Sequence, residues 1–133
     1  MDQLTIKIPS LPENIRIVES FIDNANDFFG FSNDLYGNIM VSVTEAVNNA
    51  ILHGNKSQQN KDVTLSLQIE DKDFIKFIIT DQGEGFDYNN LPDPTAPENI
   101  EKIGGRGIFL IRQLCDDLSF DDNGKMVILS FNL

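Results

Sequence analysis

Two strand-like runs only four residues apart constrain the fold of this chain more than any other feature. Residues 63–69 and 74–80 are rich in β-branched and aromatic side chains, and Asp71-Lys72-Asp73 between them predicts a hairpin turn. Strands joined by so short a turn pair antiparallel. The chain is therefore expected to build its fold around a sheet that is at least partly antiparallel.

Helical periodicity occurs twice before this hairpin. The first helix is predicted to begin with a capping box at residues 10–13 and to end at Gly30. The second is predicted to begin at Ser32 or Asn33 and to run to about His53. Two consecutive helices therefore precede the paired strands.

Shorter segments complete the pattern. Residues 4–8 alternate as a first strand, residues 107–114 return to helical spacing, and residues 126–131 form a last strand after a turn at 122–124. Helices and hairpin strands in this order predict an α+β fold, a two-layer α/β sandwich with helices on one face of a mixed, mostly antiparallel sheet. The length of 133 residues suits a single domain, residues 1–133.

Composition excludes several function classes. Ten basic and 21 acidic side chains give a formal net charge of −11, which repels nucleic acid and anionic membrane surfaces. No run approaches the roughly 20 apolar residues of a membrane span, and the start of the chain lacks a signal-peptide pattern. With the lone Cys115, these features predict a cytoplasmic protein. Any bound nucleotide must be held by local backbone N–H groups, a metal ion or a few placed cations.

The second predicted helix carries a polar stripe. Glu45, Asn49 and His53 are spaced i, i+4, i+8, so they lie on one face. Solvation explains many such stripes, but Asn is a poor helix former and gives no solubility advantage. A carboxylate and an amide oxygen one turn apart can hold a hard cation, and Glu45 could accept a proton. His53 equally suits a simple role near the helix C-terminus.

A first glycine-rich turn follows the second hairpin strand. Asp81-Gln82-Gly83-Glu84-Gly85 places glycines where the backbone could approach a ligand closely. An aspartate at a strand end can accept a hydrogen bond from an exocyclic amine such as that of adenine. Taken alone, the turn is also explained by ordinary turn chemistry.

A second glycine-rich turn, Gly104-Gly105-Arg106-Gly107, stands directly before a helical segment. Backbone amides at such a helix start can cradle phosphate, although a tight entry turn explains the same residues. Between the two turns, residues 86–103 contain prolines that forbid an ordinary helix or central strand. A long irregular segment in a small domain predicts a functional lid.

Together these motifs resemble those of the GHKL superfamily, whose Bergerat ATP-binding fold is shared by gyrase-type topoisomerases, a heat-shock chaperone, histidine kinases and mismatch-repair ATPases. The resemblance covers about residues 35–131. The N box is matched by Glu45, Asn49 and His53, the first glycine box by Asp81, Gly83 and Gly85, and the second by Gly105 and Gly107.

The resemblance implies ATP and Mg²⁺ as cofactors. Asn49 would coordinate magnesium that bridges the ATP phosphates, and Asp81 would hold the adenine amine. The second glycine box with its helix, including Gly104, would contact phosphate, and residues 86–103 would form the ATP lid. His53 belongs to the same binding set.

The length of the chain favours one branch of the superfamily. It leaves no room for the phosphorylated-histidine module of histidine kinases or for the added domains of the larger ATPases. The chain is thus similar to stand-alone anti-sigma factors of the bacterial serine-kinase type, which bind a sigma factor, phosphorylate an anti-anti-sigma partner and form homodimers. Glu45 would then orient or deprotonate the attacking hydroxyl, and Arg106 or Lys102 would add positive charge near the γ-phosphate.

Two alternatives remain open. One is an ATP-gated protein-binding regulatory module without kinase activity. It gains weight because Ile103-Gly104 stands where some relatives place an arginine, although the carboxylate of Glu45 favours a kinase. The other is a small hydrolase that uses Glu45 and Asp81 as paired acids, which would leave the glycine boxes unexplained.

Overall fold

The computed structural model describes residues 3–70, 73–85 and 105–133. In chain order its helices and strands are β1 (Gln3–Pro9), α1 (Ile15–Phe29), α2 (Asn33–Asn49), β2 (Asp62–Glu70), β3 (Phe74–Thr80), α3 (Gly105–Leu114), β4 (Asp117–Asp121) and β5 (Met126–Asn132). Every helix and strand expected from the sequence is present. None of the helices in these ranges is both long and apolar enough to cross a membrane.

The strands form one sheet in the order β1-β2-β3-β5-β4. β2 and β3 form the predicted hairpin, with Leu65 opposite Ile79, and β4 and β5 form a second hairpin around residues 122–124. All four pairings between the described strands are antiparallel. The α+β class is confirmed, and no parallel pair is found among these strands because the two hairpins meet through antiparallel β3 and β5.

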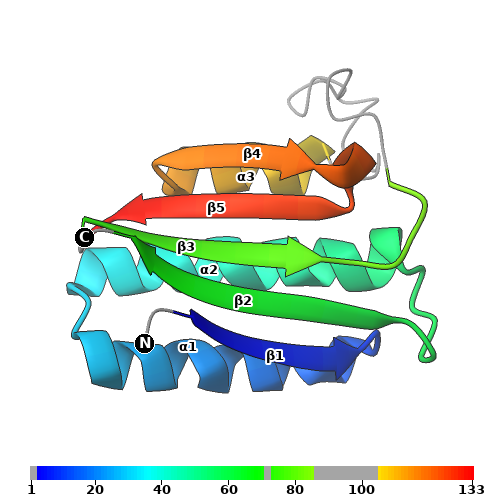
Figure 1. Cartoon of the computed structure of the whole chain (residues 1–133), viewed down its shortest axis with the longest axis horizontal. Helices are drawn as coiled ribbons and strands as arrows, with labels where there is room; N and C mark the ends of the chain where they lie inside the picture. Colours follow the sequence, from blue (N-terminus) through cyan, green and yellow to red (C-terminus); the bar gives the residue numbers. More distant parts are fainter. Residues whose placement is uncertain (1–2, 71–72, 86–104) are drawn as a thin grey trace.

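The three helices cover one face of the sheet, as Figure 1 shows with the sheet in front and the helices behind it. Side chains along a strand point alternately to the two faces of the sheet, so every second one faces the helices. Examples are Leu65, Leu67 and Phe77, which are all fully buried. α2 contributes Val43 and Val47 to the same core. The hydrophobic core therefore lies between the two layers.

The ends of the first two helices test the capping predictions. Gly30 ends α1 in the left-handed region, with φ of 69°, and Ser32 caps α2 by accepting a hydrogen bond from the Leu35 N–H. The capping box at residues 10–13 was wrong. α1 begins only at Ile15, after a short 3-10 turn, because the fully buried Ser10 hydroxyl donates instead to the carbonyl of Lys61 at 2.6 Å.

The end of α2 departs from a regular helix. The predicted helix to His53 is present, but after Asn49 it widens into a π turn over Ala50–Gly54. The Asn55 N–H donates to the carbonyl of Ala50, five residues earlier, at 2.8 Å. π turns of this kind occur frequently at functional sites, and this one lies at the edge of the cavity described next.

Candidate nucleotide-binding site

A cavity of about 300 Å³ lies between the last turns of α2 and the end of β3. These two ends of the elements lie on the right in Figure 1. Its walls are largely apolar, with Ile79 and Val127 from the sheet and Ile108 from α3. Asn49 and Asp81 contribute polar groups. An apolar space with a few convergent polar groups is typical of sites for small molecules.

The helix stripe predicted from the sequence meets this cavity only in part. Asn49 and His53 line it, whereas Glu45 lies one turn before Asn49 and is not among the lining residues. Glu45 and Asn49 are half-buried, and His53 is exposed on the π turn. Neither Glu45 nor Asn49 makes a side-chain hydrogen bond within the described part of the chain, so both keep their oxygens available for a ligand.

Gly107 brings α3 close to this stripe. A methyl group on Gly107 would lie 2.5 Å from Glu45 Oε1 and 2.8 Å from Asn49 Nδ2, which is closer than van der Waals contact allows. The glycine predicted for the second glycine box therefore lies directly against the two side chains predicted to carry the chemistry. Its missing Cβ leaves them their space.

Asp81 is held at the end of β3 by backbone hydrogen bonds. Its N–H donates to the carbonyl of Lys125 at 3.0 Å, and its Oδ1 accepts from the Gly83 N–H at 2.8 Å. Burial of the carboxyl raises the pKa of Asp81 above its ordinary value, against the opposing effects of the Gly83 N–H, Lys125 and Lys61. A half-buried carboxylate at this position can accept a hydrogen bond from a ligand N–H.

Glycines surround the Asp81 carboxylate. A Cβ on Gly54 would collide with that carboxylate, and a Cβ on Gly83 would collide with the carbonyl oxygen of Gly54. Gly85 has φ of 84° and lies against the carbonyl of Asn123 in the turn after β4. Of the two glycines in the first glycine box, only Gly85 needs a positive φ, while Gly83 is required for close packing.

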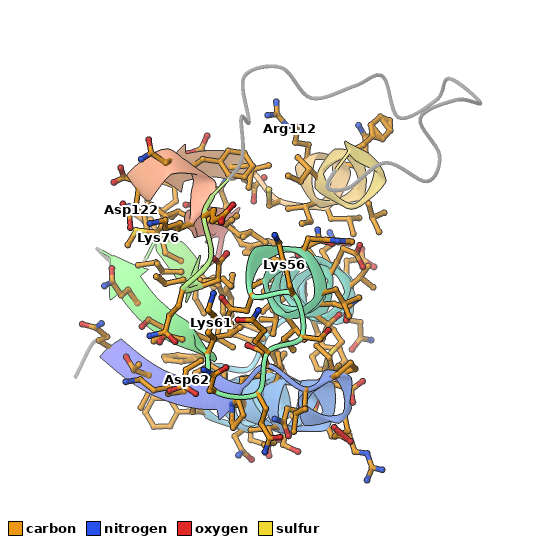
Figure 2. All side chains as sticks on the ribbon, turned by 90° about the vertical axis from the view of Figure 1, so that its right-hand side faces the viewer. Lys56, Lys61, Asp62, Lys76, Arg112 and Asp122 are labelled. Carbon is orange, nitrogen blue, oxygen red and sulfur yellow. The ribbon has the colours of Figure 1, made fainter. Side chains whose placement is uncertain are left out.

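One cation of the cavity was not predicted. Lys56 lies two residues after the π turn and has φ of 53°. Among the cavity-lining residues that the structure describes, it is the single lysine, and there is no arginine. Figure 2 shows it on the helix side of this end of the molecule, with Asp122 on the sheet side. The negative net charge indicated that a placed cation was needed, but nothing in the local sequence singled out this lysine.

Several predicted residues fall where the structure gives no side-chain description. Lys102, Gly104 and the lid at 86–103 lie outside the described residues. α3 begins at Gly105, two residues before the helical segment predicted at 107–114, so part of the second glycine box lies inside the helix; the side chain of Arg106 is outside the described part. The contacts predicted for these residues stay predictions.

The donor atoms present also bear on the predicted magnesium site. Within the described ranges, no group of three or more His, Cys, Asp or Glu residues could hold a metal ion. The amide oxygen of Asn49 and the carboxylate of Glu45 are hard oxygen ligands on one helix face. This set fits Mg²⁺, which is usually held by one or two protein oxygens together with substrate phosphates.

Comparison with known proteins gives a consistent result. The family model described as "histidine kinase-like ATPase domain" matches residues 8–131. Serine-protein kinase RsbW of Oceanobacillus iheyensis is 30% identical over 97% of this chain and 85% of its own length. The protein of the same name from Bacillus subtilis is 23% identical over 96% of this chain and 82% of its own.

Two solved structures share the fold. The crystal structure of the RsbU and RsbW domains of a Mycobacterium tuberculosis protein has a TM-score of 0.67 at 12% identity, covering 99% of this chain and 32% of that one. The histidine kinase domain of a blue-light activated histidine kinase from Erythrobacter litoralis has a TM-score of 0.56 at 19% identity, covering 95% of this chain and 61% of that one.

Proposed function

The chain belongs to the histidine kinase-like ATPase domain family, and on that premise we propose that it is an ATP-dependent serine/threonine protein kinase and anti-sigma factor. It would phosphorylate an anti-anti-sigma partner and regulate transcription by partner switching. The observation that carries this proposal is the cavity that joins Asn49 and Asp81, with Glu45 one helical turn away. Relatives named serine-protein kinases that match nearly the whole chain support it.

The base of the nucleotide would occupy the apolar part of the cavity. Asp81 would accept a hydrogen bond from the exocyclic amine of adenine, while the ring packs between Ile79 and Ile108. The carboxylate is already oriented by the Gly83 N–H. Adenine recognition would therefore need little rearrangement of the protein.

The phosphates would lie toward Asn49 and the start of α3. The Asn49 amide oxygen would hold Mg²⁺, which when bound offsets phosphate charge. The first backbone N–H groups of α3, which begins at Gly105, have no acceptor within the helix itself and would suit phosphate oxygens. His53, Lys102, Gly104 and Arg106 complete this proposed binding set, with residues 86–103 as the lid.

Glu45 would act on the hydroxyl group of the protein substrate. As the serine oxygen bonds to the γ-phosphorus, the bond from phosphorus to the bridging oxygen of ADP breaks, and Glu45 takes the hydroxyl proton. The position of Glu45 beside Asn49, but outside the cavity lining, suits a group that meets the incoming protein rather than the nucleotide. Arg106 or Lys102 would add positive charge near the γ-phosphate.

The partners are proposed on the same basis. A sigma factor and an anti-anti-sigma protein would alternate on the chain, which would act as a homodimer of single ATP-binding domains. The net charge of −11 suits a partner with a basic surface. It is unfavourable for nucleic acid and anionic membrane.

The decisive experiment is recovery of partner proteins from the native cell on the tagged chain, followed by incubation with labelled ATP and Mg²⁺. Label on a small partner protein supports the kinase. Nucleotide-dependent capture without label supports the alternative, an ATP-gated protein-binding module. If the purified chain does not bind ATP, both are contradicted.

A further inference from the structure

Asn55 is a fully buried polar residue that the proposed function does not use. It follows the π turn at the end of α2, and its side-chain amide makes three hydrogen bonds. The Nδ2 group donates to Ser10 Oγ at 2.8 Å and to the carbonyl of Asp62 at 3.0 Å. The Oδ1 atom accepts from the Gln82 N–H at 2.7 Å. One side chain thus joins the ends of β1 and β3 and the start of β2.

This combination of contacts is specific to asparagine at this position. The site requires two donors and one acceptor in one short planar group. An aspartate offers no donor when ionised, leucine offers neither, and glutamine is one methylene longer in a fully buried position. The amide therefore does more than fill volume in the core.

The third of these bonds fixes the backbone beside the adenine-binding aspartate. Gln82 directly follows Asp81, whose own N–H and carboxylate are held by Lys125 and Gly83. Gly54, which directly precedes Asn55, leaves the space that the Asp81 carboxylate fills. The pair at 54–55 thus provides both the room for that carboxylate and a hydrogen bond to the residue next to it.

We infer that Asn55 is a positioning residue that holds Asp81 in the orientation that selects adenine by its exocyclic amine. This inference rests on the proposed function, since it assumes that ATP occupies the cavity. A hydrogen bond to a charged acceptor depends strongly on distance and angle. Loss of the anchor at Gln82 would therefore reduce selectivity for the amine more than it reduces binding of the rest of the nucleotide.

The test compares the Kd of ATP with that of purine riboside triphosphate, which lacks the 6-amino group, both with Mg²⁺. In the unchanged chain ATP is expected to bind about 10- to 100-fold more tightly, the range for one hydrogen bond to a charged group. In Asn55→Ala the ratio is expected to fall below about threefold. Asp81→Ala is expected to remove the preference, and adding Asn55→Ala to it is expected to change the ratio no further.

Ser10→Ala is the matched control. It removes one partner of the Asn55 amide but leaves the bond to the Gln82 N–H. Its melting temperature is expected to fall while its nucleotide ratio stays within about twofold of the unchanged chain. A merely structural role for Asn55 would lower stability in both variants and leave both ratios intact, which would overturn the inference.

Two further measurements keep the inference testable if Asn55→Ala does not fold. Asn55→Leu fills a similar volume without the donors and the acceptor. Its preference for ATP over purine riboside triphosphate is expected to fall as it does in Asn55→Ala. In the unchanged chain, the hydrogen of the Gln82 backbone N–H is expected to exchange with solvent at least about tenfold more slowly than in an unstructured peptide. Exchange at the peptide rate overturns the inference. Failure of the unchanged chain to bind ATP overturns the proposed function as well, whereas ATP binding with an unaltered ratio in the Asn55 variants overturns this inference alone.

Discussion

At the scale of single residues, the site depends on glycines that have no side chain as much as on the polar side chains beside them. Gly54 leaves room for the Asp81 carboxylate, and Gly107 leaves room for Glu45 and Asn49. Neither Gly54 nor Gly107 has a positive φ, so their importance comes from close approach rather than from backbone freedom. Substitutions at these positions should therefore separate function from stability.

Gly107→Ala is expected to weaken ATP binding by about tenfold or more, because the new methyl group displaces Glu45 and Asn49. Both contacts are with the ends of flexible side chains, so the fold should tolerate the change. Alanine in a helix is favoured over glycine by roughly 0.5–1 kcal/mol, so the melting temperature should stay the same or rise. Calorimetric titration with ATP and thermal unfolding measure the two effects.

The matched control is Gly37→Ala in α2, where an added methyl group meets nothing within 4 Å. This variant should show the same gain in stability with unchanged ATP affinity. If both variants bind ATP equally well, the contact of Gly107 with the polar stripe has no functional meaning.

Glu45→Gln is expected to slow phosphorylation of the partner protein by about 10²–10⁴-fold, the usual contribution of a general base. ATP affinity should change little, since Glu45 does not line the cavity. Single-turnover transfer of labelled phosphate gives the rate, with Glu19→Gln, an exposed carboxylate on α1, as the control. A rate equal to that of the control would rule out the proton-accepting role.

Asp81→Asn is expected to stabilise the fold at pH 7 while weakening ATP binding. Burial raises the pKa of the folded-state carboxyl, so the unfolded chain loses this proton at lower pH than the folded chain does. Stability therefore falls as pH rises from the ordinary carboxyl pKa of about 3.9 toward the raised value. The amide oxygen can still accept from the Gly83 N–H. Melting temperatures measured from pH 3 to pH 8 should show the gain of the variant disappearing at the acid end, and a variant that is less stable at pH 7 would refute this account.

At the scale of secondary structure, α2 and its π turn organise the site. The regular helix positions Glu45 and Asn49, and the widened turn after it carries His53 and brings Gly54 against Asp81. A helix that simply ended at Asn49 would leave the cavity without this edge. The site therefore requires both the regular part and the irregular part of one element.

The sequence predicted the regular elements well because hydrophobic periodicity reports them directly. The strands at 63–69 and 74–80 and the helix end at Gly30 were all found within a residue or so. It could not predict the π turn, since a change from i+4 to i+5 hydrogen bonding leaves little trace in side-chain pattern. The capping box at Ser10 failed because a tertiary bond to Lys61 competes with the local one.

The same distinction holds for the site. Motifs singled out Asn49, Asp81 and Gly107, and the structure places the first two in the cavity wall and Gly107 against Asn49. Lys56 and Asn55 were missed because their places in the cavity wall and in the buried hydrogen-bond network arise only when distant segments meet.

Gly30→Ala tests the left-handed end of α1. Its φ of 69° is costly for alanine, and no atom lies within 4 Å of the added methyl group, so backbone strain is the expected source of any loss. The free energy of unfolding is expected to fall by about 1–2 kcal/mol. Urea unfolding measures the loss, and Gly30→Asn should recover part of it because asparagine tolerates this conformation better. Equal stability of all three chains would contradict the role of Gly30 as a helix end.

At the scale of the whole molecule, the binding of a nucleotide works against the net charge. The formal charge is −11, and MgATP is itself an anion. The described lining of the cavity offers the charge of Lys56, which is local compared with the repulsion from the whole acidic surface. Long-range repulsion and short-range attraction should therefore respond differently to salt.

The association rate of MgATP is expected to rise with ionic strength, by about two- to fivefold between roughly 20 and 200 mM salt, because screening weakens the long-range repulsion first. Stopped-flow mixing with a fluorescent ATP analogue measures the rate, and the corresponding adenosine analogue, which carries no phosphate, should show no such dependence. Lys56→Gln should bind more slowly at every salt concentration and depend on salt more steeply, since the local attraction is reduced while the net repulsion is increased. A rate that falls with added salt would mean that local cations dominate the approach of the nucleotide, and that the acidic surface acts on protein partners alone.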